Sequence, residues 1–458
     1  MSMGTLTMVA DAVNGTLVGA DHAFESVSTD TRTLQPGQLF FALQGERFDA
    51  AEFVHEATRL GAAGAVVAQR QSCDLPQVEV TDTRSALGRL AKKWRARFVI
   101  PVIAVTGSNG KTTVKEMIAG ILRAHVGDEA ALLVTAGNLN NEIGLPLTVL
   151  RLRDRHRIAV LEMGASHRGE IAYLADIAAP GIGVVTNAGI AHLEGFGGKA
   201  NIAASKGELF ESLSNDGVAI INRDDEFFTF WRDLCGHADT RTFGLSDSAD
   251  FRAADIREVV DATHCELGFQ LQSPFGNLDV QLPMAGRHNV RNALAAAAAA
   301  TAAGATWEAV QQGLAAVSNV AGRMRAATAA GGMTIFDDSY NANPGSVRAA
   351  IEFLSQRDGE QWLILGDMAE LGPSSAELHR AVGEQAKKAG IARLFCLGEQ
   401  ARESAEAFGA GAASFASIDD LSEAIKAEQQ PGIVLLVKGS RCMGLEKLVA
   451  TLQQEGAR

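Results

Sequence analysis

Residues 102–113 read Val102-Ile103-Ala104-Val105-Thr106-Gly107-Ser108-Asn109-Gly110-Lys111-Thr112-Thr113, and the organisation of the chain follows from them. An apolar run leads into a glycine turn, and Lys-Thr-Thr opens a segment whose apolar residues recur at helical spacing. A strand, loop and helix in this order are typical of phosphate binding, because backbone N–H groups and the helix N-terminus face the polyphosphate. The pattern predicts that Lys111 reaches the outer phosphates and that the Thr112 hydroxyl binds Mg²⁺.

This loop departs from the general pattern G-x-x-x-x-G-K-[ST], because position 105 is valine rather than glycine. A lone glycine turn before a helix is usually only a turn. The Lys-Thr-Thr that follows, placed between a strand and a helix, favours nucleotide binding over that simpler interpretation.

Length and composition limit the class of protein. A chain of 458 residues predicts two to four domains, and its net charge of −13 argues against nucleic-acid binding. A local basic pocket for an acidic small molecule remains compatible with that charge. The five cysteines form no CxxC pair, which predicts reduced thiols and neither a disulfide framework nor a zinc site. With no signal pattern and no apolar run long enough for a membrane span, we expect a soluble cytoplasmic protein.

The order of strand and helix patterns predicts an α/β protein with three domains. Residues 1–84 read as a small α/β unit, residues 85–318 as the nucleotide domain, and residues 319–458 as a second doubly wound parallel sheet. Alternating apolar residues within 240–283 predict an antiparallel excursion, and the alanine run 295–300 predicts a packed helix.

Polar residues follow the predicted strands of the nucleotide domain. Glu162 ends the strand beginning at residue 158, where ligands of parallel sheets sit, so it is a candidate Mg²⁺ ligand; a strand-end charge facing water is the alternative. His192 lies just past the strand 182–186 and is either a second metal ligand, a transition-state stabiliser or a structural histidine. Asn289, near a helix start, could cap that helix or bind an adenine edge.

Two further motifs keep two interpretations each, and one lysine has a single interpretation. Asn138, Asn140 and Asn141 suit directional hydrogen bonds to a ligand, or they serve their own turn. The run Ser28-Thr29-Asp30-Thr31-Arg32 suits a phosphate or carboxylate, or it is a solvated turn. Lys206, within a predicted helix 201–213, reads from its residue type alone as a surface charge.

In this order, the motifs resemble the ATP-dependent Mur ligase family, which makes amide bonds during peptidoglycan precursor synthesis. The family-level marks are the loop at 106–113, Glu162, and residues 187–192 and 287–292; the family also lacks the glycine at position 105. The runs 137–146, 162–170, 337–344 and 366–372 resemble the member that uses D-alanyl-D-alanine. The resemblance covers essentially the whole chain.

The resemblance implies a role for each candidate residue. The N-terminal domain would hold the UDP-sugar, with Ser28, Thr31 and Arg32 as candidates. ATP would contact Gly107, Ser108, Asn109, Gly110, Lys111, Thr112, Thr113, Asn289, Asn292, Arg323 and Asp338. Metal ligands would be Thr112, Glu162, His192 and, if carbamylated, Lys206; the resemblance leaves carbamylation open. Peptide substrates would meet Asn138, Asn140, Asn141, Tyr340, Asn341 and Asn343. The catalytic groups would be Lys111, His192, Lys206 and Arg323.

The implied activity joins D-alanyl-D-alanine to UDP-N-acetylmuramoyl-tripeptide through an acyl phosphate, with ATP and Mg²⁺, in a protein expected to be monomeric and not inserted in membranes. The last domain would complete the site on closure. A different amide ligase of the same fold, such as a folylpolyglutamate-type enzyme, is one alternative. A P-loop ATPase switch is another, although the chain lacks an Asn-Lys-x-Asp guanine motif.

Overall fold

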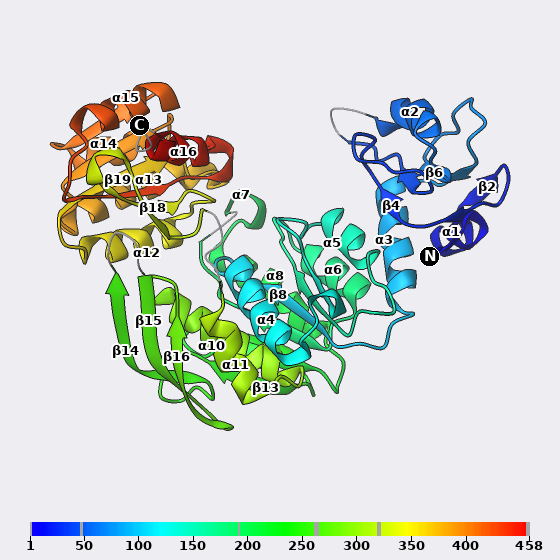
Figure 1. The fold of residues 1–458 in the computed structure, drawn as a ribbon, viewed down its shortest axis with the longest axis horizontal. Coiled ribbons are helices and arrows are strands. Elements are labelled where there is room, and N and C mark those ends of the chain that lie inside the picture. Colours follow the sequence, from blue (N-terminus) through cyan, green and yellow to red (C-terminus); the bar gives the residue numbers. More distant parts are fainter. Residues whose placement is uncertain (1, 46–48, 191–192, 261–264, 318–321, 455–458) are drawn as a thin grey trace.

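The structure is a computed structural model that describes residues 2–45, 49–190, 193–260, 265–317 and 322–454. Three α/β domains follow one another along the chain. Figure 1 shows the N-terminal domain and the C-terminal domain at opposite ends of the molecule, with the central domain between them. The predicted three-domain α/β architecture is confirmed.

The N-terminal domain is built on a five-stranded sheet in the order β2-β7-β6-β5-β4. Its strands are short, and a separate antiparallel pair, β1 with β3, lies beside the sheet. Its elements are β1 (Gly4–Thr5), α1 (Leu6–Val13), β2 (Thr16–Val18), β3 (Ala23–Phe24), β4 (Val27–Ser28), β5 (Leu39–Phe41), η1 (Ala50–Phe53), α2 (Val54–Arg59), β6 (Gly64–Val67) and β7 (Gln77–Glu79).

The central domain carries a six-stranded parallel sheet in the order β13-β12-β11-β8-β10-β9. Strand β8 of the phosphate loop lies inside this sheet, and its five residues are buried, as expected for a parallel sheet covered on both faces. The first elements are α3 (Thr83–Arg95), β8 (Val102–Thr106), α4 (Lys111–Val126), η2 (Glu129–Ala131), β9 (Leu132–Val134), α5 (Gly144–Val149), β10 (Ile158–Glu162) and α6 (Glu170–Ala178). The sheet continues through β11 (Ile182–Val185), α7 (Leu193–Phe196), α8 (Lys199–Glu211), β12 (Val218–Asn222), α9 (Phe228–Leu234) and β13 (Asp239–Phe243).

The antiparallel excursion begins later than the sequence predicts. Residues 240–243 lie in β13, which pairs in parallel with β12, so their assignment to the excursion is wrong. Alternation along four residues does not reveal which strand will be the neighbour. The excursion itself is the sheet β14 (Arg252–Val260), β15 (Cys265–Ser273) and β16 (Gly276–Leu282), whose neighbours are antiparallel.

The alanine run is a packed helix, as predicted. Helix α10 (His288–Ala302) buries residues 295–300 almost completely, because the small side chains let it lie close to its neighbours. The next helix, α11 (Trp307–Ala315), packs on α4 even more closely. A Cβ atom on Gly313 would lie 2.3 Å from the Cα of Ile121, so only glycine fits there.

The C-terminal domain holds the second predicted sheet, in the order β17-β18-β22-β19-β20-β21. Its strands are parallel except for the edge strand β17, which is antiparallel to β18. The elements are β17 (Arg325–Thr328), η3 (Ala330–Gly332), β18 (Thr334–Asp338), α12 (Pro344–Ser355), β19 (Glu360–Gly366), η4 (Gly372–Ser374), α13 (Ser375–Lys388), β20 (Arg393–Leu397), α14 (Arg402–Phe408), β21 (Ala412–Phe415), α15 (Ile418–Glu428), β22 (Ile433–Lys438), η5 (Arg441–Met443) and α16 (Glu446–Gln454).

The predicted domain boundaries stay predictions. The boundary after residue 84 falls in the first turn of α3, which starts at Thr83 and is capped by the Asp82 carboxylate. The boundary before residue 319 lies outside the described residues. Among the described helices, none has the length and apolar character that a membrane crossing requires.

Candidate active site

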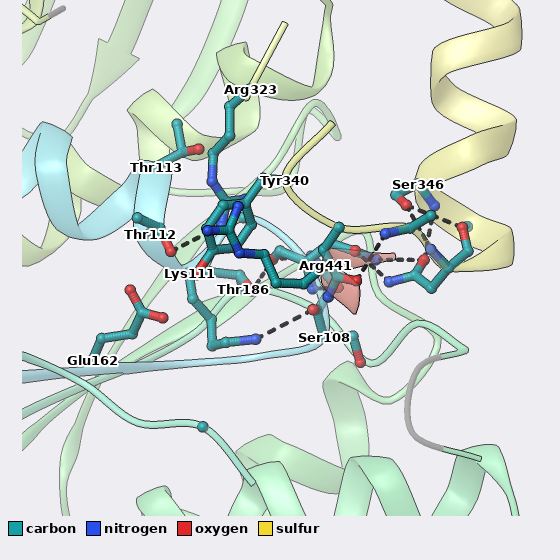
Figure 2. A pocket seen from close by; sticks show the side chains of 18 of the residues that line it. Ser108, Lys111, Thr112, Thr113, Glu162, Thr186, Arg323, Tyr340, Ser346 and Arg441 are labelled. Carbon is teal, nitrogen blue, oxygen red and sulfur yellow. Dashed lines mark hydrogen bonds between the residues drawn. The ribbon is translucent and has the colours of Figure 1, made fainter. Parts of the chain in front are cut away.

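A cavity of ≈ 1070 Å³ lies between the central and C-terminal domains, at the carboxyl ends of the parallel strands of both sheets. This is where open parallel sheets bind ligands. Figure 2 shows its centre, with Glu162 and Thr112 on one side of Lys111 and Ser346 on the other. The predicted site residues that line it are Ser108, Asn109, Gly110, Lys111, Thr112, Thr113, Asn138, Asn140, Asn141, Glu162, Asn289, Asn292, Arg323, Asp338, Tyr340, Asn341 and Asn343.

The phosphate loop can follow its path only with glycine at two positions. Gly107 and Gly110 have φ values of 138° and 83°, in the region that favours glycine. A Cβ atom on Gly107 would lie 2.0 Å from Thr186 Oγ1. The loop after β11 supports the turn, because Thr186 Oγ1 and Asn187 Nδ2 both donate to the Asn109 carbonyl.

Lys111 lies at the first turn of α4, folded back over the loop. Its Nζ donates to the carbonyl oxygens of Gly107, at 2.7 Å, and Ser108, at 3.3 Å. Burial lowers the pKa of Lys111, the Glu162 charge opposes that shift, and the Arg323 charge adds to it. A polyphosphate would offer this amine stronger acceptors than backbone carbonyls.

Glu162 has the environment of a metal ligand. Its side chain is buried, its Oε1 accepts from Asn140 Nδ2 at 2.8 Å, and its Oε2 is buried without a hydrogen-bond partner. A buried carboxylate oxygen without a hydrogen bond suits a cation, and its burial contradicts the alternative of a charge facing water. Thr112 and Glu162 therefore fit Mg²⁺. No three His, Cys, Asp or Glu side chains cluster among the described residues, so phosphates and water would supply further ligands.

Lys115 does not line the cavity, but it is a buried neighbour of Glu162 that the sequence reasoning missed. It is 1% exposed, and its Nζ donates to Thr135 O at 2.9 Å, lies 2.8 Å from Glu116 Oε1 and 4.0 Å from Glu162 Oε2. Lys115 therefore places a positive charge beside the Glu162 carboxylate. Its position one helical turn after Lys111 could have indicated that it faces the same sheet edge.

Lys206 is buried rather than a surface charge, so the interpretation from its residue type alone is wrong. Helix α8 holds it with 2% exposure, its Nζ 3.3 Å from Ala165 O and 5.1 Å from the centre of the Phe196 ring. Burial, with a smaller effect of Lys111, lowers the pKa of Lys206 to about 7. Lys206 does not line the cavity, although Ala165 does. His192 lies outside the described residues.

Asn289 and Asn292 form one buried unit on α10. Asn292 Nδ2 donates to Asn289 Oδ1 at 2.9 Å, and Asn289 Nδ2 donates to Ala285 O at 2.7 Å. Since a Cβ atom on Gly110 would lie 2.6 Å from Asn292 Oδ1, this pair abuts the phosphate loop.

The C-terminal wall contributes charged and aromatic groups. Arg323 Nη2 donates to Thr112 Oγ1 at 3.1 Å, and its guanidinium lies 4.3 Å from the centre of the Tyr340 ring. Asp338 forms an ion pair with Lys438 at 2.5 Å. Arg323 thus reaches the phosphate loop, whereas the Asp338 carboxylate is already engaged by its own domain.

Asn343, predicted to bind substrate, makes structural hydrogen bonds in this protein. Its side chain caps α12 by accepting from Ser346 N, and its Nδ2 donates to Asn109 Oδ1 at 2.7 Å across the two domains. Tyr340 and Asn341 line the cavity beside it. Asn140 binds Glu162, Asn141 accepts from the N–H groups of Ile143 and Gly144, and Asn138 lines the cavity.

The predicted UDP-sugar residues lie in the N-terminal domain, away from this cavity. Ser28 is buried and its Oγ donates to Asp30 O at 3.1 Å, while the exposed Arg32 pairs with Asp30. Thr31 lies in the same turn. Among the described residues, the structure does not bring Ser28, Thr31 or Arg32 to the nucleotide loop.

Family models agree with this geometry along the chain. The Mur ligase family catalytic domain matches residues 23–95, the Mur ligase middle domain matches 105–300, and the Mur ligase glutamate ligase domain matches 322–441. A protein of Escherichia coli (strain K12) named UDP-N-acetylmuramoyl-tripeptide–D-alanyl-D-alanine ligase is 45% identical over 99% of each chain. The chain belongs to the Mur ligase family.

Other similar Mur ligases point the same way. The Bacillus subtilis protein of the same name is 36% identical over 98% of each chain. A crystal structure of MurF from Acinetobacter baumannii superimposes with a TM-score of 0.90 at 35% identity, covering 98% of this chain and 99% of that one. MurF from Thermotoga maritima, in complex with ADP, matches with a TM-score of 0.82 at 26% identity over 94% and 97% of the chains. The predicted family membership is confirmed.

Proposed function

We propose that this protein is an ATP-dependent ligase that adds D-alanyl-D-alanine to UDP-N-acetylmuramoyl-tripeptide. The observation that supports it most is a cavity that joins a phosphate loop, a buried carboxylate whose Oε2 accepts no hydrogen bond, and an arginine from a second domain. The full-length relatives that bear this activity in their names, and the ADP in the Thermotoga maritima protein, support the choice of substrates. The sequence predicted the same reaction.

The chemistry must solve one problem, which is that a carboxylate is a poor electrophile. The terminal carboxylate of the tripeptide attacks the γ-phosphorus of ATP, and ADP leaves with the electrons of the broken P–O bond. The neutral amine of the dipeptide then attacks the acyl phosphate carbonyl. The tetrahedral intermediate expels phosphate, the nitrogen loses its extra proton, and an amide remains.

The central wall would hold the polyphosphate. The N–H groups of the first turn of α4 would face the phosphates, whereas those of Ser108 and Asn109 donate to Asn187. Lys111 would move from the carbonyls of Gly107 and Ser108 to phosphate oxygens. Glu162 and Thr112 would bind Mg²⁺, which neutralises charge on the phosphates when bound. Asn289 and Asn292 would face the base.

The C-terminal wall would neutralise charge that develops during transfer. Arg323 already touches Thr112, so a short movement brings its guanidinium to the γ-phosphate. Asp338 would approach the ribose, and Tyr340 and Asn341 would contact the peptide substrates. Because the two domains share the site, their approach also excludes water from the acyl phosphate.

Lys206 would serve a second cation as a carbamate. Its pKa of about 7 means that much of the amine is neutral at neutral pH, the form that adds carbon dioxide. The product would carry a carboxylate-like end near Ala165 of the cavity wall, and His192 is proposed as a further ligand of the same cation. The UDP-sugar end of the UDP-N-acetylmuramoyl-tripeptide would be held by Ser28, Thr31 and Arg32.

The test is to incubate the protein with ATP, Mg²⁺, the UDP-muramoyl-tripeptide and D-alanyl-D-alanine, omitting each in turn. We expect phosphate release only with all four components, and a UDP-muramoyl-pentapeptide by mass spectrometry. Phosphate release that ignores both peptides would contradict the proposal and favour an ATPase. Release that needs the nucleotide sugar with another amine would assign the protein to another ligase step.

A further inference from the structure

We infer that Arg441 binds the carboxylate of the incoming dipeptide and so sets the specificity for an acceptor with a free C-terminus. This inference rests on the proposed function and names a residue for a part of the substrate that none of the groups above addresses. Arg441 follows β22 and lines the cavity from the C-terminal domain. Figure 2 shows its side chain extending toward Tyr340, above Lys111.

The cations of the C-terminal wall differ in how far they are already engaged. Arg323 donates to Thr112, and Lys438 is 2.5 Å from Asp338 and also donates to Asn341 O. The Arg441 side chain donates no hydrogen bond to another described residue, and its exposed ion pair with Glu446, with Nη1 3.6 Å from Oε1, is longer than a hydrogen bond. Arg441 therefore offers a guanidinium whose donors are open to a ligand.

The backbone that carries Arg441 is held firmly. Ser440 is buried, its N donates to Asp367 O at 3.0 Å, and its Oγ accepts from Ala369 N at 2.8 Å. A Cβ atom on Gly439 would lie 2.6 Å from Leu445 Cδ1, so glycine permits the close approach of this loop to its neighbours. Such a loop presents its arginine at a defined place, which a specificity residue requires.

Tyr340 links the position of Arg441 to the reacting end of the cavity. The guanidinium groups of Arg323 and Arg441 lie 4.3 Å and 5.4 Å from the centre of its ring. Both distances permit cation–π attraction, which restricts the two side chains. Arg323 faces the phosphate loop, so Arg441 marks a second positive position beside the phosphate site.

The chemistry of the acceptor requires such a position. D-Alanyl-D-alanine carries one ammonium, which must become a free amine to react, and one carboxylate, which must be bound without hindering the amine. Lys111, the N-terminus of α4 and Arg323 are already assigned to the polyphosphate, so another cation must bind the dipeptide carboxylate. Arginine binds a carboxylate through two parallel N–H donors, which fixes direction as well as charge.

The experiment compares D-alanyl-D-alanine with its C-terminal carboxamide as acceptors for the wild-type protein, Arg441→Met and Arg441→Lys. For the wild type we expect a KM for the carboxamide about 10- to 100-fold above that for the acid, the range of a charge-assisted pair. Arg441→Met should raise the KM for the acid by a similar factor and give the same KM for both acceptors. Arg441→Lys should keep part of the discrimination, since it keeps the charge but not the paired donors.

Lys447→Met is the matched control, because this exposed lysine lies on the next helix and does not line the cavity. It should leave all KM values unchanged. The inference is overturned if Arg441→Met still discriminates between the two acceptors, or if its KM for ATP or for the nucleotide sugar rises instead. If the inference fails but the wild type still makes pentapeptide from D-alanyl-D-alanine, the proposed function stands. If the wild type makes no pentapeptide, the proposed function itself is contradicted. Melting curves of the arginine variants check that they fold, and Arg441→Lys supplies the comparison if Arg441→Met does not.

Discussion

The two walls of the cavity are built differently. The central wall consists of groups held within one domain: Glu162 and Lys115 are buried side by side, and Lys111 rests on its own loop. The C-terminal wall reaches across by separate contacts, Arg323 with Thr112 and Asn343 with Asn109. Under the proposed function, this difference predicts that the central domain alone binds the nucleotide, whereas transfer of the phosphoryl group depends on where the second domain lies.

The largest effect should come from the central wall. Lys111→Met removes the cation that would meet the outer phosphates, so we expect about a 1000-fold or greater loss of kcat/KM. ATP affinity, measured by calorimetry, should fall as well. A variant that binds ATP normally would contradict the assignment of Lys111 to the polyphosphate, and a melting temperature near that of the wild type would show that the fold is intact.

Arg323→Met should distinguish the role of the C-terminal wall in transfer from the role of the central wall in binding ATP. Its guanidinium is proposed to act on charge that develops during transfer, so we expect kcat to fall about 100-fold. The dissociation constant for ATP should change by less than about threefold, because the central wall remains complete. If nucleotide binding weakens as much as turnover does, the division between a binding wall and a transfer wall is wrong.

Lys206 offers a test through pH. Its folded pKa is about 7 and its ordinary value is 10.5, so between these values the unfolded chain binds a proton that the folded chain has released. In buffer free of carbon dioxide, the free energy of unfolding of the wild type should therefore rise with pH relative to Lys206→Met, by up to about 1.4 kcal/mol per pH unit. Below pH 7 the difference between the two proteins should be constant.

Adding hydrogencarbonate near pH 8 then tests carbamylation directly. The melting temperature of the wild type should rise and that of Lys206→Met should not, because only the lysine can form the carbamate. Equal responses of the two proteins would exclude a carbamate at this position.

The smallest effect should come from Asn343. Asn343→Ala removes the cap of α12 and the bond to Asn109, so we expect a loss of about 1 kcal/mol in the free energy of unfolding. Asn343→Ser restores a capping hydroxyl without reaching Asn109 and serves as the matched control. If the two variants have the same kcat, the Asn109 bond contributes nothing to bringing the walls together.

Local patterns predicted much of this molecule. The phosphate loop, the strand-end position of Glu162 and the packed alanine helix follow from residue type and spacing, which act over a few residues. The parallel pairing of β13 did not follow, because strand neighbours are set by contacts distant in sequence. Two lysines show the same limit. Lys206 reads as a surface charge and Lys115 was not singled out, yet the packing of α8 and α4 buries both.

The asparagines and the turn at Ser28 mark a second limit. Asn343 and Asn141 satisfy backbone groups, and Ser28 and Arg32 satisfy their own turn through Asp30. Residue type alone cannot say whether such a group faces a ligand or its own backbone, because both offer the same hydrogen bonds.

The most direct measurement follows oxygen from the donor to phosphate. With ¹⁸O in the terminal carboxylate of the UDP-muramoyl-tripeptide, attack of that carboxylate on ATP places a labelled oxygen in the phosphate released, detectable by mass spectrometry. This result is predicted if the two walls bring the carboxylate to the γ-phosphate. Unlabelled phosphate, formed while the pentapeptide accumulates or while ATP is merely hydrolysed, would contradict it.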